Sequence, residues 1–71
     1  DLATTRDYLA YLRETMGRAV RDFQPFEDAY AGTDWSRYAA LPAFAEANRI
    51  NAYGTYLAME QEALAPAATG K

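Results

Sequence analysis

Apolar residues return every three or four positions along the first third of the chain, a spacing typical of helices that bury one face. These residues are Leu9, Leu12, Met16, Val20 and Phe23. The pattern predicts a helix over Leu2 to Phe23 with Asp1 as its N-cap. We expect it to end near Gln24, because Pro25 disfavours helical geometry at the residue before it.

A second long stretch has the same spacing. Its apolar residues are Phe44, Ala47, Ile50, Tyr53, Leu57 and Leu64. They predict a second long helix from Pro42 to Leu64 that presents these residues on one broad face. Residues 65–71 contain Pro66 and little that would be buried, so we expect a disordered tail there.

The segment between the long helices is rich in helix-ending and helix-starting residues. Pro25 suits the first turn of a short helix over 26–31, and Gly32 is predicted to end that helix in a left-handed conformation. Thr33 or Asp34 can cap a further turn over 35–38. No segment has a strand pattern. The sequence therefore predicts an all-α fold in which residues 1–64 form one domain, with two long helices joined by a short helix and turn segment in a small bundle.

Two glycines interrupt the predicted long helices. Gly17 and Gly54 each cost about 1 kcal/mol relative to alanine in a helix interior, and they would let the two helices approach closely if they faced each other. On the first helix, Arg18 is four residues from both Glu14 and Asp22, so two surface ion pairs are expected there.

The composition removes most catalytic chemistry. The chain of 71 residues has no His and no Cys, which excludes disulfides, the usual zinc sites and the common nucleophile and acid–base arrangements. Glu60 and Glu62 are two residues apart on a predicted helix, so their carboxylates point in different directions. We expect no catalytic, cofactor or metal site in this chain.

Charge and hydropathy restrict the possible partners. Ten acidic and seven basic residues give a net charge of -3, the wrong sign for a surface that neutralises nucleic-acid phosphates. No apolar run reaches the roughly 18 residues of a membrane span, so we expect a soluble protein with no membrane partner. Its compartment stays open, since a chain without Cys fits any redox environment. Because the chain starts at Asp1 without a Met, we expect it to be a piece of a longer protein.

Aromatic and amide residues provide the candidate interface. Six Tyr, three Phe and one Trp are many rings for this length; we expect most in the core, with an interface or ligand pocket as the alternative. Asn and Arg within the second helix either are solvated or bond to a nearby loop, or they reach a second domain. The possible interface residues are Tyr8, Trp35, Asn48, Arg49, Asn51 and Tyr53.

Two segments resemble a known family. The sequence from Asp1 to Leu9, with Leu12 and Arg13 after it, resembles the helix that follows the last catalytic strands in metallo-β-lactamase-fold hydrolases. The segment from Phe44 to Tyr53, continuing to Glu60, is similar to the terminal helix of the same proteins, notably those similar to sulfur-oxidation and quinoprotein-relay hydrolases. The resemblance implies a parent zinc-dependent hydrolase whose metal ligands, a His-rich motif with further His and Asp, lie outside this chain.

Three functions are compatible with these observations. The leading expectation is a non-catalytic C-terminal helical region that packs against the catalytic domain, where Tyr8, Trp35 or the 48–51 stretch shapes the substrate entrance or a subunit contact. The alternative is a free-standing helical module that dimerises or binds a partner helix through its aromatic face. The third is a carrier that holds a small ligand in an aromatic pocket.

Overall fold

The computed structural model describes residues 2–64, and over that range the chain is a small helical bundle without strands. Its elements are α1 (Leu2–Arg21), α2 (Phe26–Gly32), a single 3-10 turn η1 (Ser36–Tyr38) and α3 (Phe44–Leu64). The all-α prediction is confirmed. The predicted cap at Asp1 and the predicted tail over 65–71 lie outside the described residues.

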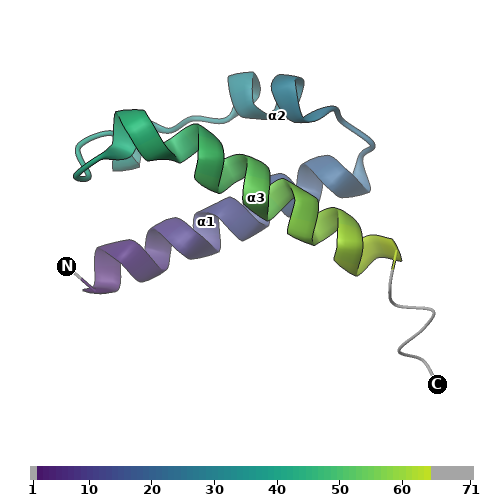
Figure 1. Ribbon diagram of the computed structural model, residues 1–71, viewed down its shortest axis with the longest axis horizontal. Coiled ribbons are helices and arrows are strands. Elements are labelled where there is room, and N and C mark those ends of the chain that lie inside the picture. Colours follow the sequence, from purple (N-terminus) through teal and green to yellow (C-terminus); the bar gives the residue numbers. More distant parts are fainter. Residues whose placement is uncertain (1, 65–71) are drawn as a thin grey trace.

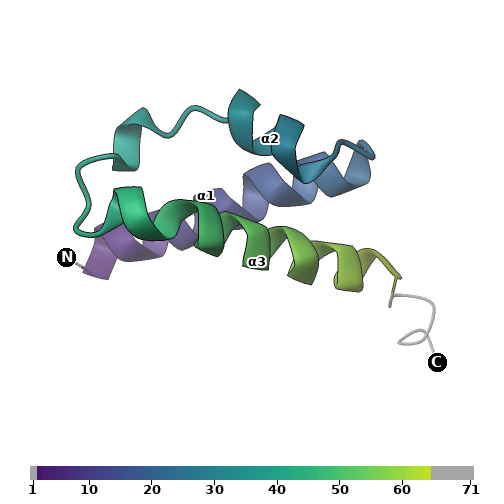
Figure 2. The same ribbon diagram turned by 45° about the horizontal axis from the view of Figure 1, so that its top comes forward.

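The long helices α1 and α3 cross side by side and run in the same general direction (Figures 1 and 2). They can do so because α2 and η1 carry the chain back before α3 begins. α2 lies along one side of the pair, so the core forms where the three helices meet. The buried apolar residues are Tyr8, Leu12, Met16, Ala19, Phe26, Ala29, Tyr38, Ala52 and Tyr56.

The centre of α1 follows the sequence prediction and its two ends do not. Leu12 and Met16 are almost fully buried, as their spacing predicts. Leu9 is 54% exposed and Phe23 is 92% exposed, so the predicted buried face was wrong at these positions. The inward stripe instead begins at Tyr8, one residue earlier, and continues at four-residue spacing.

Phe23 is exposed because α1 ends before it. The backbone N–H of Gln24 donates to Ala19 O at 2.8 Å and that of Phe23 donates to Val20 O at 3.1 Å. These two bonds make a Schellman motif, whose characteristic residue adopts a left-handed backbone and is usually glycine. Phe23 occupies that position with φ 58°, a conformation that costs an L-residue about 1–2 kcal/mol.

The buried face of α3 also differs from the predicted face. Asn48, Ala52 and Tyr56 point into the bundle at four-residue spacing, whereas most of the predicted apolar face is exposed. The cause is a pair of hydrogen bonds that turns the polar side chain of Asn48 inward: it accepts from Tyr8 on α1 and donates to Tyr30 on α2. α3 starts at Phe44 instead of Pro42, because Ala43 has φ 60° and cannot continue a right-handed helix.

The loop after α2 is partly as predicted. No glycine in the described range has a positive φ, so the expectation of a left-handed Gly32 was wrong: Gly32 is the last residue of α2. The chain leaves through an extended Thr33, whose hydroxyl donates to Ala29 O at 2.7 Å. The N-cap of η1 is Trp35 and not Thr33 or Asp34 as predicted, although the Asp34 carboxylate accepts the Ser36 N–H at 3.0 Å and stabilises the start of the turn.

The two helix glycines have different surroundings. A Cβ added at Gly17 would lie 3.0 Å from the Met59 Cε, so the missing side chain lets α3 pack closely on α1. A Cβ added at Gly54 would meet nothing within 4 Å. The two glycines therefore do not face each other across the helix pair. Of the two predicted Arg18 ion pairs, the described residues contain the one with Glu14, at 3.2 Å.

Candidate functional site

A buried polar junction joins all three helices. The Tyr8 hydroxyl donates to Asn48 Oδ1 at 2.5 Å, and Asn48 Nδ2 donates to the Tyr30 hydroxyl at 3.2 Å. Asn48 is only 1% exposed. Asn51 Nδ2 reaches the Tyr8 hydroxyl from the next turn at 3.4 Å. These atoms satisfy one another, so the junction fixes how α3 is rotated against α1 and α2.

Trp35 extends this junction along the loop after α2. Its indole Nε1 donates to Tyr30 O at 3.1 Å, and its ring meets the Tyr11 ring nearly at right angles with centroids 5.9 Å apart. Tyr11 in turn donates from its hydroxyl to Asp34 O at 2.6 Å. Of the predicted interface residues, Tyr8, Trp35 and Asn48 therefore have their polar atoms engaged inside the chain.

Arg49 connects α3 to α2. Its guanidinium forms a two-pronged ion pair with the Glu27 carboxylate and lies 5.3 Å from the centroid of the Phe26 ring. Hydrogen bonding from Arg49 lowers the pKa of Glu27 below its ordinary value. Arg49 thus bonds to a neighbouring helix, while Asn51 and Tyr53 remain exposed beside it.

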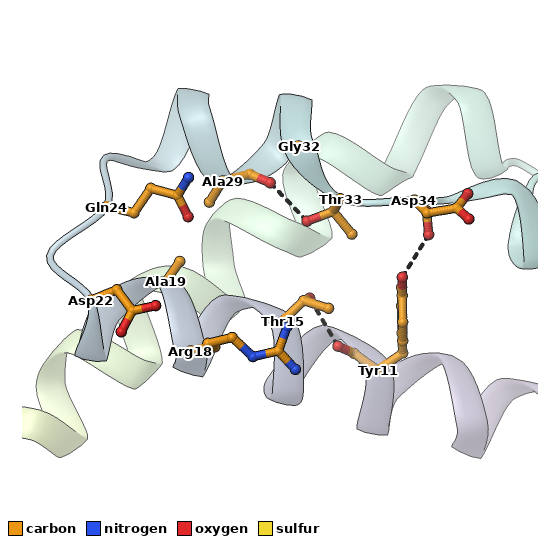
Figure 3. A pocket seen from close by; sticks show the side chains of 10 residues that line it. All are labelled: Tyr11, Thr15, Arg18, Ala19, Asp22, Gln24, Ala29, Gly32, Thr33 and Asp34. Atoms are coloured by element: carbon orange, nitrogen blue, oxygen red, sulfur yellow. Dashed lines mark hydrogen bonds between the residues drawn. The ribbon is translucent and has the colours of Figure 1, made fainter.

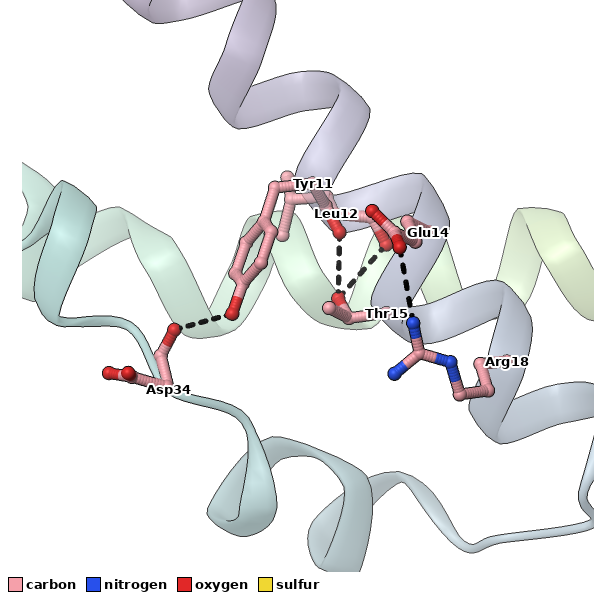
Figure 4. Close-up of polar contacts among 6 residues, drawn as sticks. All are labelled: Tyr11, Leu12, Glu14, Thr15, Arg18 and Asp34. Carbon is pink, nitrogen blue, oxygen red and sulfur yellow. Dashed lines mark hydrogen bonds and ion pairs between the residues drawn. The ribbon is translucent and has the colours of Figure 1, made fainter.

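A polar hollow of about 240 Å³ separates α1 from α2 and the following loop (Figure 3). Its hydroxyl groups already donate to backbone carbonyls: Thr15 to Tyr11 O at 2.9 Å, Thr33 to Ala29 O, and Tyr11 to Asp34 O. Arg18 points along the wall and pairs with Glu14 (Figure 4). The hollow has no pairing of nucleophile and base, and we interpret it as a structural seam.

Metal chemistry does not fit the residues present. Among residues 2–64, no group of three or more carboxylate, His or Cys side chains converges on a point where an ion could bind. The whole sequence has neither His nor Cys. Zinc, which the family resemblance implies for a parent enzyme, therefore has no ligand set in the described part of this chain.

The clearest exposed apolar feature is a surface on the outer side of α3, of which Tyr53 also touches the Phe26 ring of α2, with centroids 5.0 Å apart. It consists of Ile50 (73% exposed), Tyr53 (49%), Leu57 (41%) and Leu64 (78%), and we call it the outer α3 surface. Ile50 also lines a shallow groove toward α1 that includes Leu9. Large apolar side chains that cluster on a surface mark interaction sites more often than scattered ones do.

Sequence reasoning named Tyr53 but missed its neighbours as surface residues, because it assigned them to the core. One available signal was that α3 has apolar residues around its whole circumference, which is typical of a helix covered on more than one side. A second was Asn48, a poor helix former within the pattern, which indicated that the buried face lies elsewhere.

No helix in the described range is long and apolar enough to cross a membrane. Comparisons with known proteins return no match, whether against family models, curated proteins or solved structures.

Proposed function

We propose that this chain is a non-catalytic helical module that packs, through the outer α3 surface, onto the catalytic domain of a larger protein, a metallo-β-lactamase-like hydrolase. The observation that carries the proposal is a row of exposed apolar side chains on a helix that is already buried on its opposite side. The resemblance of the two long helices to that family is what supports this choice of partner class.

The spacing of the row suits a helix as the contacting element. Ile50, Leu57 and Leu64 are seven residues apart, and Tyr53 lies between the first two, which is the repeat that keeps one face of a helix along a neighbour. At 1.5 Å per residue, the row extends about 21 Å. A partner helix of four turns would cover it.

The size of the surface favours an attached domain over a free partner. Together, the exposed areas of its four side chains amount to more than two fully exposed side chains. Burying this apolar surface stabilises the complex by on the order of 3–6 kcal/mol. A free partner would lose about that much or more in translational and rotational freedom. A domain on the same polypeptide has an effective concentration in the millimolar range. At that concentration a binding free energy of about 4 kcal/mol is enough to keep the two parts in contact.

Gly54 supports close contact on this side. It lies one turn from both Ile50 and Leu57, is exposed, and has no atom within 4 Å of the place its Cβ would take. A glycine in a helix interior is destabilising by about 0.5–1 kcal/mol, and no contact within the described chain makes use of its missing side chain. A helix that packs on the outer α3 surface would make use of it.

The first test is the intact mass of the protein that contains this sequence in its source cells, which we call the natural product. It is captured with an antibody against the peptide from Asp1 to Leu12. A protein of several hundred residues with zinc ligands upstream of this region is expected. A product near 7.9 kDa would reject the enzyme context.

The second test uses that natural product. Hydroxyl-radical footprinting, read by mass spectrometry, should label Ile50 and Leu57 more slowly in the natural product than in the 71-residue chain, whose helicity circular dichroism establishes first. Gly54→Ala should reduce this protection, because the added methyl group keeps the partner at a distance. Gly17→Ala is the matched control, since Gly17 faces Met59 inside the bundle. Equal labelling of both residues in the two proteins would refute the proposal.

Self-association is the outcome that would favour the alternative, a dimerisation module. The heptad spacing of the outer α3 surface would also suit a second copy of the same helix. In that case the melting temperature of the 71-residue chain rises with protein concentration. We expect a melting temperature that does not change between about 5 and 500 µM, because the outer α3 surface is small for a stable free dimer.

A further inference from the structure

A second apolar hollow lies where the end of α1 meets the last turns of α3. Its volume is about 420 Å³, and it is lined mainly by Val20, Phe23, Pro25, Tyr56, Glu60 and Leu64. We call it the terminal hollow. Leu64 belongs to both the terminal hollow and the outer α3 surface, so a partner that covers one reaches the other.

Phe23 lines the terminal hollow in a backbone conformation that destabilises the isolated chain. Its backbone is left-handed, with φ 58°, and its ring is 92% exposed. Glycine would adopt this conformation without strain. The Phe23 backbone is thus strained, and almost no other residue of the chain packs on its ring. Strained residues of this kind cluster at binding and switch sites.

Glu60 is the one carboxylate among the residues that line the terminal hollow. It lies partly buried on α3, and the ion pairs of the described residues do not include it. A partner that covers the hollow with apolar groups alone would remove water from this charge and leave it uncompensated, which is strongly unfavourable. An occupant that brings a positive charge avoids this cost.

Resting on the function proposed above, we propose that the terminal hollow receives a basic side chain, Arg or Lys, from the catalytic domain. The aliphatic stem of that side chain packs against Val20 and Leu64, and its charged head pairs with the Glu60 carboxylate. The exposed face of the Phe23 ring adds a cation–π contact. This contact is polar and directional, so it sets the register in which a partner helix lies along the outer α3 surface.

A second copy of this chain that docks through its own α3 does not meet the requirement as well. On α3 itself the one basic residue is Arg49, and Glu27 already pairs with it. A basic residue on the catalytic domain leaves that internal ion pair intact. A second copy that docks through α3 would have to give up that ion pair, so we take the catalytic domain as the source of the charge.

The test is footprinting of the natural product in three forms: wild type, Glu60→Gln and the matched control Glu62→Gln. Glu62 is on the same helix but pairs with Arg13 on α1 at 3.2 Å, and both side chains of that pair are more than half exposed. In the wild type, Phe23 should be labelled more slowly than in the 71-residue chain. Loss of a charge-assisted contact weakens docking about tenfold, so Glu60→Gln should raise Phe23 labelling by up to about tenfold, whereas Glu62→Gln should leave it unchanged.

The outcomes separate this inference from the function on which it rests. Protection of Ile50 and Leu57 without protection of Phe23 would overturn the inference and leave the proposed function standing. Equal labelling of Phe23 in Glu60→Gln and Glu62→Gln would also overturn it, because the charge would then have no role. Full labelling of Ile50, Leu57 and Phe23 in the natural product would reject the proposed function itself.

Discussion

Replacing Asn48 with leucine tests whether the buried polar junction holds the helices in register. In the native chain the Asn48 amide accepts from Tyr8 on α1 and donates to Tyr30 on α2. Leucine fills a similar space but has no polar atom. The Tyr8 hydroxyl, on a side chain that is 8% exposed, then loses its buried acceptor.

The expected loss of stability follows from the hydrogen-bonding group that is left unpaired. A buried donor without a partner costs about 1–3 kcal/mol, and water can replace the bond to the half-buried Tyr30. A chain of this length has a total stability of about 4–10 kcal/mol. At about 4–8 °C per kcal/mol, a loss of 2 kcal/mol lowers the melting temperature by about 8–16 °C.

Urea unfolding, followed by circular dichroism and by the fluorescence of Trp35, measures this loss. Tyr8→Phe removes the other partner, leaves the buried Asn48 Oδ1 without its donor and should also cost about 1–3 kcal/mol alone. The double variant Tyr8→Phe/Asn48→Leu should be more stable than the two single losses predict, by at least about 0.5 kcal/mol, because neither group is then unpaired. Strict additivity, or an Asn48→Leu variant as stable as the wild type, would refute the role assigned to the junction.

Four further predictions concern single residues. Phe23→Gly should stabilise the isolated chain by about 1 kcal/mol in urea unfolding, because glycine relieves the left-handed strain; an unchanged midpoint would contradict the strain argument. Gly54→Ala should stabilise the same chain by about 0.4–1 kcal/mol, since its Cβ meets nothing, while it weakens docking of the natural product. Burial, reinforced by the Glu60 charge, raises the pKa of Tyr56 above its ordinary value of 10.0. The unfolded state therefore loses this proton first, and the free energy of unfolding falls as pH rises from 10 through the higher native pKa. A Tyr56→Phe chain should lack this component of the loss of stability at alkaline pH. The Arg49 hydrogen bond lowers the pKa of Glu27 below 4.5. The stabilising effect of the Glu27–Arg49 ion pair is therefore present above pH 4.5 and disappears as pH falls through the native pKa of Glu27. A Glu27→Gln chain with an unaltered acid-unfolding profile would count against the ion pair.

Local sequence determined where the helices form and which side-chain chemistry the chain lacks. Pro25 lies in the short connection after α1 and directly precedes α2, because its ring fixes φ and supplies no N–H. Asp34 stabilises the turn after α2, since its carboxylate reaches an N–H two residues ahead. The lack of His and Cys is a property of the composition and by itself excludes the usual zinc sites and the common nucleophile arrangements. These features depend on a residue and its immediate neighbours or on composition, so the sequence alone was sufficient.

Only the tertiary structure decided which face of α3 is buried and which remains as the outer α3 surface. Apolar residues surround α3, so their spacing allows more than one rotation of the helix against α1. The rotation that occurs is set by Asn48, whose partners Tyr8 and Tyr30 are 40 and 18 residues away in the sequence. Phe23 is exposed because α1 ends before it in a Schellman motif, and apolar spacing alone does not show where a helix ends. Helical periodicity records which residues share a face, but the pairing of distant polar groups determines where that face points.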